Sequence, residues 1–133
     1  MTALHWAVEN GHEDIVRLLL DCGADIHAKD KSNRIALHES TGNGHESTVR
    51  LLLDRSANIN AMRGFYYMTA LHRAANNGRE STVQLLLDRG ADINAKDIEG
   101  MTALSWAVEN GHKSTVRLLF NCAPTSMPRI PKE

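Results

Sequence analysis

A twelve-residue phrase occurs four times along this chain, and the repetition limits the fold more than any other feature does. "MTALHWAVENGH" at residues 1–12 returns as "MTALSWAVENGH" at residues 101–112, with eleven of twelve residues identical. "IALHESTGNGH" (35–45) and "TALHRAANNGR" (69–79) keep the same frame. The matching leucines, Leu4, Leu37, Leu71 and Leu104, are separated by 33, 34 and 33 residues. Such a period is typical of folds that stack one short structural unit.

Each unit carries the signals of two short helices and a turn-rich connection. In the first unit, Thr2 can accept hydrogen bonds from free N–H groups at a helix start, and Asn-Gly ends "TALHWAVENG". "HEDIVRLLLDCG" begins with acids and ends in glycine, which predicts a second helix. Its apolar run, Ile15, Val16, Leu18, Leu19 and Leu20, is too broad for one stripe, so we expect this helix to be mostly buried. Neither helix buries its apolar surface alone, and about three stacked units are needed.

These units resemble the ankyrin repeat family. Its pattern of T-P-L-H-x-A, then G-H, then V-x-L-L-L-x-x-G-A-D-x-N-A is similar to all four units, with Ala in place of the usual Pro. The resemblance implies an all-α solenoid of stacked antiparallel helix pairs with projecting hairpin-like loops. It implies repeats at about 1–33, 34–67, 68–100 and, truncated, 101–123, and we expect a flexible Pro-containing tail at 124–133. It also makes His5, His38 and His72 structural, with rings that bond the backbone of the neighbouring turn.

The second unit departs most from this pattern. Ile35 replaces Thr, Ser40 replaces Ala and Ser56 replaces Gly. Because each repeat is stabilised by its neighbours, we expect this repeat to be locally less stable.

The position after the motif histidine varies through the four units as Trp6, Glu39, Arg73 and Trp106. Equivalent positions in adjacent repeats lie about 10 Å apart, a gap that long side chains can close. We therefore expect Glu39 and Arg73 to form an ion pair flanked by the two tryptophans. The alternative is that both charged groups extend into solvent, because surface pairs contribute little.

Composition and spacing argue against several functional classes. Net charge is −1, with 15 Lys and Arg scattered among 16 acids, so no basic face for nucleic acid is expected. No run approaches the roughly 20 apolar residues of a membrane span, and no membrane insertion is expected. The repeat histidines form ladders about 10 Å apart, too far for one metal ion. With no nucleophile or phosphate-loop motif either, we expect neither an enzyme nor a cofactor.

Two remaining residue types bear on location and modification. Cys22 and Cys122 share one repeat position three repeats apart, so we expect free thiols and an intracellular protein, cytoplasmic or nuclear. Leu87, Asp92 and Asn94 have the spacing that the family resemblance associates with asparaginyl hydroxylation. The favoured alternative is that Asn94 only fixes its turn through its side chain.

One loop breaks the register and holds half of the chain's six aromatic residues. "AMRGFYYM" (61–68) has eight residues where "AKDKSNR" and "AKDIEGM" have seven. Arg63-Gly64 and Tyr67 stand where the other loops place Asp and their late turn residue, so we expect a reshaped turn. Phe65, Tyr66 and Tyr67 at a loop tip suit an interface hot spot. The alternative is that one ring folds over the neighbouring hairpin and the others shield the turn.

The resemblance and the aromatic loop together predict a non-catalytic module that binds an unidentified protein through its concave face and loop tips. The predicted contact residues are Lys31, Arg34, Phe65, Tyr66, Tyr67, Met68, Ile98, Glu99 and Met101, with Glu9, Asn43, Asn76, Asn77 and Glu109 behind them. The alternative is a structural fragment of a longer ankyrin array or of a multidomain protein whose activity lies elsewhere. Because the first repeat lacks a polar cap, self-association through it is a further expectation.

Overall fold

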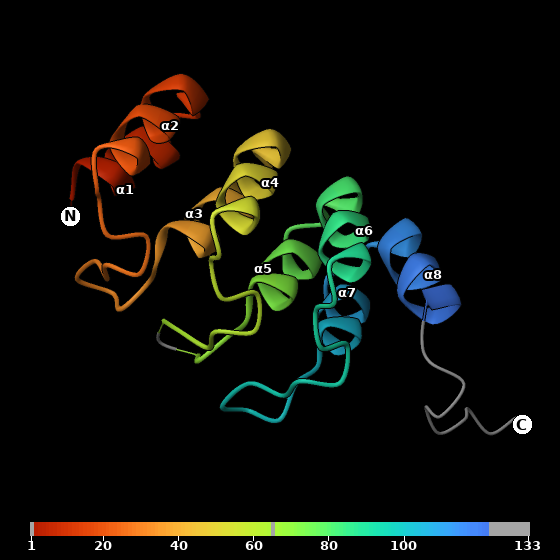
Figure 1. Ribbon diagram of the computed structural model, residues 1–133. Coiled ribbons are helices and arrows are strands. Elements are labelled where there is room, and N and C mark those ends of the chain that lie inside the picture. The colour runs from red at the N-terminus through yellow and green to blue at the C-terminus, as the bar shows by residue number, and fades with distance from the viewer. Residues whose placement is uncertain (1, 65, 123–133) are drawn as a thin grey trace, which may run out of the picture.

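The chain folds into four stacked pairs of antiparallel helices over the residues that the computed structural model describes, 2–64 and 66–122 (Figure 1). The pairs are α1 (Ala3–Glu9) with α2 (Glu13–Asp21), α3 (Ala36–Asn43) with α4 (Glu46–Asp54), α5 (Ala70–Asn76) with α6 (Glu80–Asp88), and α7 (Ala103–Glu109) with α8 (Lys113–Cys122). The predicted all-α solenoid is confirmed. The tail expected at 124–133 lies outside the described residues.

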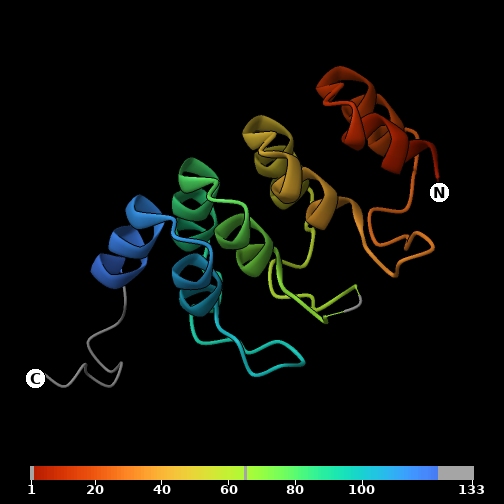
Figure 2. The same ribbon diagram turned by 180° about the vertical axis from the view of Figure 1, so that it is seen from behind.

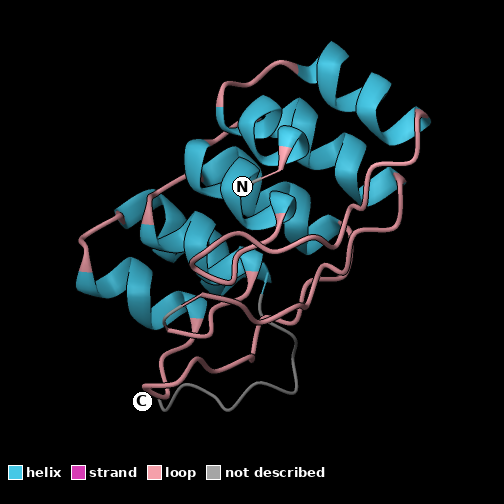
Figure 3. Ribbon diagram, turned by 90° about the vertical axis from the view of Figure 1, so that its left-hand side faces the viewer, coloured by secondary structure: helices cyan, strands magenta, loops and turns pink. Residues whose placement is uncertain are grey.

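The helices form two layers, and the long loops lie on one side of the stack. The first helices contact one another in the order α1, α3, α5 and α7, and the second helices in the order α2, α4, α6 and α8. Seen from behind and from the side, the loops between the pairs project together, next to the first helices (Figures 2 and 3). We call the surface made by these loops and the first helices the loop face.

The core consists of equivalent residues from successive repeats. Leu4, Leu37 and Leu71 are buried in the first layer, and Leu52 and Leu86 in the second. The expectation that the second helix of the first repeat is mostly buried is wrong. In α2 only Val16 is buried, while Ile15 is 47% and Leu18 is 60% exposed. The reason is that α4 and α6 have a neighbour on each side in their layer, whereas α2 packs in its layer on α4 alone.

The motif histidines link each repeat to the next. Nε2 of His5 donates to the carbonyl of Arg34 (3.1 Å), Nε2 of His38 to Met68 (2.8 Å), and Nε2 of His72 to Met101 (2.8 Å). All three rings are buried. The structural role that the family resemblance implies for them is confirmed, and these bonds position the start of every loop-face helix from α3 onward.

Candidate functional site

Two of the three loops are closed by an aspartate, as repeat spacing would suggest. Oδ1 of Asp30 accepts hydrogen bonds from the N–H groups of Ser32 (2.8 Å) and Arg34 (2.9 Å). Oδ1 of Asp97 accepts from the N–H groups two and four residues later, each at 2.9 Å. These bonds hold the pKa of both aspartates below its usual range, although burial opposes the shift. Both loops are therefore rigid turns built around a carboxylate.

The third loop, residues 61–68, has no aspartate at this place, and two backbone hydrogen bonds close it. The N–H of Arg63 donates to the carbonyl of Met68 (2.9 Å), and the N–H of Met68 donates back to Arg63 (3.0 Å). Gly64 and Tyr67 have positive φ angles of 89° and 58°. Tyr67 thus takes the left-handed conformation that Asn33 and Gly100 take in the other loops, at φ angles of 64° and 77°. The expected reshaping of this turn is confirmed.

Tyr66 connects its loop to the next repeat. Its carbonyl accepts a hydrogen bond from the N–H of Ile98 (2.9 Å), and its ring meets Trp106 edge-on, with centroids 6.4 Å apart. The indole N–H of Trp106 donates to Oδ2 of Asp97 (2.7 Å). Tyr66 therefore packs against the neighbouring repeat, which agrees with the alternative that one aromatic ring folds over the next hairpin. The side chain is still 50% exposed. We call Tyr66, Ile98 and Trp106 the apolar surface.

The other predicted contact residues differ in accessibility. Tyr67 is 49% and Ile98 70% exposed, Lys31 and Glu99 are exposed, and Arg34 and Met101 are half-buried. Behind them, Glu9, Asn43, Asn77 and Glu109 are exposed and Asn76 is half-buried. Phe65 lies outside the described residues.

Met68, also predicted as a contact residue, is only 7% exposed. Its backbone pairs with Arg63, and its carbonyl accepts from the buried ring of His38. Only a small part of this side chain is available for contact.

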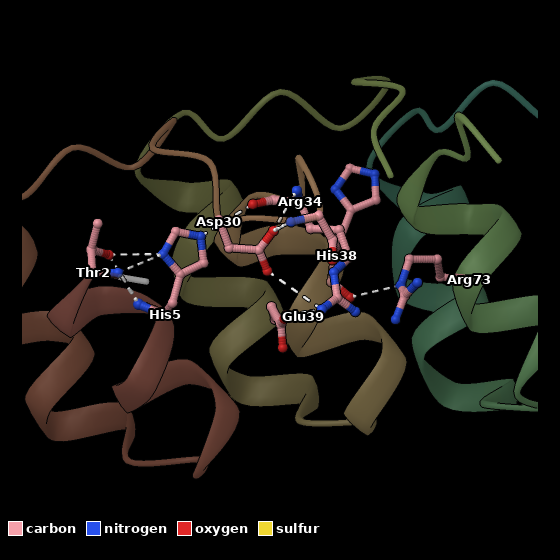
Figure 4. Close-up of polar contacts among 8 residues, drawn as sticks. Thr2, His5, Asp30, Arg34, His38, Glu39 and Arg73 are labelled. Atoms are coloured by element: carbon pink, nitrogen blue, oxygen red, sulfur yellow. Dashed lines mark hydrogen bonds and ion pairs between the residues drawn. The ribbon is translucent and has the colours of Figure 1, made fainter. Parts of the chain in front are cut away.

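The predicted ion pair between Glu39 and Arg73 is wrong. Oε2 of Glu39 lies 3.2 Å from Nη2 of Arg34, the same nitrogen that lies 3.4 Å from Asp30, while Nε of Arg73 donates to the carbonyl of His38 (3.2 Å) (Figure 4). Glu39 pairs with Arg34 because the turn closed by Asp30 holds Arg34 next to the start of α3. Burial raises the pKa of Glu39, and the charge of Arg34 opposes that shift. The tryptophans do not flank a charge pair, since Trp106 contacts Tyr66 and Asp97 instead.

Three arginines line a small pocket beside this cluster. Its volume is about 190 Å³, and its lining includes Ser32, Arg34, Arg63, Tyr66, Met68 and Arg73. We call it the arginine pocket. Sequence reasoning missed Arg63 as a member and assigned Arg73 to a different partner. Gly42 is the sequence feature that relates to the position of Arg73. A Cβ at this residue would lie 2.7 Å from Nη2 of Arg73. Glycine at this position of α3 leaves room for the guanidinium group.

Metal binding, membrane crossing and modification of Asn94 are the other possibilities on which the described part of the chain bears. Within residues 2–64 and 66–122, no three His, Cys, Asp or Glu side chains are grouped to hold a metal ion. Over the same residues, no helix combines the length and apolar character needed to cross a membrane. Asn94 donates its backbone N–H to Oδ1 of Asp92 (3.0 Å) and is exposed.

A comparison with protein families agrees with this architecture. The family model described as "Ankyrin repeats (3 copies)" matches residues 1–63 and residues 37–127. The two matches overlap and together span the whole helical stack.

Proposed function

The chain belongs to the ankyrin repeat family, and from this premise we propose that it is a non-catalytic module that binds a partner protein through its loop face. Ankyrin repeats are in general protein–protein interaction modules. A shared fold does not select a target, so the proposal rests on the residues of this loop face. Its contacts would be Tyr66, Tyr67, Ile98 and Trp106, with Lys31, Arg34, Glu99 and Met101 around them.

The apolar surface is the observation that carries the proposal. Tyr66 and Ile98 are 50% and 70% exposed, yet their backbones are joined by a hydrogen bond of 2.9 Å. Trp106 is fixed from below by Asp97. Rigid, exposed aromatic and aliphatic groups gain contact area on binding with little loss of side-chain entropy, which is typical of interface hot spots.

The test is affinity capture from extracts of cells that express the protein, followed by direct binding to any recovered partner. Tyr66→Ala combined with Ile98→Ala is expected to reduce capture by tenfold or more, because hot-spot residues contribute about 2 kcal/mol or more each. Phe120→Ala is the matched control, since it removes a ring of similar exposure (47%) from α8. Equal capture by wild type and the double variant, with unchanged helicity, would contradict the proposal.

A second candidate function is supported by the two ends of the stack. At one end Ile15 and Leu18 are exposed, and at the other Val108 and Phe120 are 58% and 47% exposed. These faces would suit further repeats of a longer array, in a protein whose activity lies elsewhere, or self-association. Light scattering over a range of concentrations tests self-association: a monomer at all concentrations that unfolds cooperatively would exclude it.

A further inference from the structure

The arginine pocket holds more positive charge than its acidic neighbours balance. Arg34 lies within 3.4 Å of Asp30 and 3.2 Å of Glu39. Among the described residues, neither Arg63 nor Arg73 has an acidic partner. Arg63 donates to the carbonyl of the preceding residue (2.9 Å), and Arg73 donates to the carbonyl of His38 (3.2 Å). Two of the three guanidinium groups at this pocket therefore lack a direct ion pair, although Glu39 and Asp30 lie near enough to Arg73 to favour its charged form.

The hydrogen-bonding groups around the pocket are also incompletely used. The Nε atoms of Arg34 and Arg63, and Oε2 of Glu39, are shielded from solvent and have no hydrogen-bond partner among the described residues. A buried donor without an acceptor is costly, and native structures contain few of them. Burial lowers the pKa of Arg73 and the charge of Arg34 lowers it further, while the charges of Glu39 and Asp30 oppose the shift. An anion in this pocket would offset the repulsion between the guanidinium groups.

The walls of the pocket indicate which anion fits. Tyr66 and Met68 add apolar surface beside the guanidinium groups, which suits a charged group on a short aliphatic stem. The volume of about 190 Å³ admits one side chain and no larger element. Glu39 lies close by, so a doubly charged phosphate would meet repulsion that a single carboxylate meets less strongly. A carboxylate also matches the planar fork of an arginine with two parallel hydrogen bonds.

We propose that the arginine pocket binds the side-chain carboxylate of a glutamate or aspartate in the partner protein, which presents an acidic segment to the loop face. Arg63 and Arg73 would hold the carboxylate, and Tyr66 would cover its aliphatic stem. This inference deepens the proposed function and depends on it.

The test uses a blocked pentapeptide with two glutamates (GELEG) as the probe. The whole chain, labelled with ¹⁵N at arginine, is titrated while the Nε–H signals are followed by NMR. We expect saturable shifts for Arg63 and Arg73, and no saturable shift with the glutamine peptide GQLQG. Arg63→Gln and Arg73→Gln should each weaken GELEG binding by about tenfold, the usual scale of a charge-assisted hydrogen-bond pair. Arg63→Lys, which keeps the charge, should lose less.

Arg50→Gln is the matched control, because Arg50 is an exposed arginine on α4 whose one ion pair within the described part of the chain is with Glu46 (3.1 Å). Equal loss in this variant would show non-specific charge attraction and overturn the assignment. The absence of saturable shifts with GELEG would overturn it as well, as would an equal response to GQLQG. Tighter binding of the same peptide with phosphoserine in place of the glutamates would show that carboxylate is not the preferred group.

The two proposals fail in different ways. If partner capture is lost in the Tyr66→Ala, Ile98→Ala variant but survives both Arg63→Gln and Arg73→Gln, only the acidic chemistry is wrong. If capture survives all of these changes, the loop face is not the binding surface and the proposed function fails.

Discussion

Helices α3 and α5 occupy equivalent places in adjacent repeats, yet they are built differently at the start. In α5 the Thr69 hydroxyl accepts from the N–H of His72 (3.2 Å) and lies 2.8 Å from its Nδ1. In α3 the cap position is Ile35, which has no side-chain hydrogen bond, and Nδ1 of His38 is buried without a hydrogen-bond partner among the described residues. The same repeat pattern therefore contains one helix, α5, whose N-terminal hydrogen-bonding groups have partners, and another, α3, in which a buried group lacks one.

The two helices also differ further along. Ser40 and Thr41 of α3 are buried where α5 has Ala74 and Ala75, and both hydroxyls donate to carbonyls three residues earlier (2.9 Å each). Such bonds compete weakly with helix geometry. Gly42 then leaves the space that Arg73 occupies. One residue that distinguishes α3 from α5, Gly42, thus lies against Arg73 of the arginine pocket, and we infer that helix stability and pocket shape are coupled at this position.

The largest expected effect is the pH dependence of His38. Burial lowers its pKa from its usual 6.5 to about 4, and the charges of Arg73 and Arg63 contribute, while the bond to Met68 opposes the shift. Between those values the unfolded chain binds a proton that the folded chain does not. The stability contributed by His38 is thus present above pH 6.5 and lost as pH falls toward 4, by about 3 kcal/mol in total.

Urea unfolding at a series of pH values measures this loss, and His38→Gln, whose amide can still donate to Met68, should flatten the curve. His72 shifts in the same direction through burial, so His72→Gln gives the comparison within α5. The raised pKa of Glu39 acts oppositely, adding stability as pH falls through it. Asp30 and Asp97, with lowered pKa values, lose their contribution only at lower pH. A wild-type stability that does not change over this range would contradict the prediction.

The next-largest effect is expected when the N-cap hydroxyl of α5 is removed. Thr69→Val keeps the shape of the side chain but removes the hydroxyl, leaving the N–H of His72 without its acceptor. We expect a loss of about 1–2 kcal/mol in the free energy of unfolding. Thr82→Val is the control, because Thr82 is equally buried (2%) but lies inside α6. If both variants lose the same amount, the cap is not the cause.

A smaller effect is expected when an N-cap hydroxyl is introduced in α3. Ile35→Thr should place a hydroxyl near Nδ1 of His38, as Thr69 does for His72. Ile35 is 2% exposed, so lost apolar burial offsets part of the gain, and we expect a net stabilisation of up to about 1 kcal/mol. Ile35→Val has the same shape as the threonine variant and isolates the hydroxyl. A threonine variant no more stable than the valine variant would show that α3 gains nothing from a cap.

The periodic parts of the molecule were predictable, and the pocket was not. Helix pairs, loop positions and the histidine bonds follow from residues that recur every 33 or 34 positions, so each copy supports the others. Arg34, Arg63 and Arg73 occupy three different repeat positions, and no period relates them. The exposure of Leu18 was missed for a related reason: the local sequence of α2 resembles that of buried helices, and only the number of neighbours differs.

The smallest effect on stability should come with a change in binding. Gly42→Ala removes a glycine from the last turn of α3, which by itself favours the helix by at most about 1 kcal/mol. The added Cβ would lie 2.7 Å from Nη2 of Arg73, so the guanidinium group must move and its bond to the carbonyl of His38 is lost. We expect these effects nearly to cancel in urea unfolding, while GELEG binding weakens severalfold. Ser47→Ala, an exposed position on α4 outside the predicted contact residues, should leave binding unchanged. A variant that is more stable by the full helix gain and binds GELEG as before would show that α3 can be strengthened without cost to the pocket, and that the coupling inferred for this repeat does not exist.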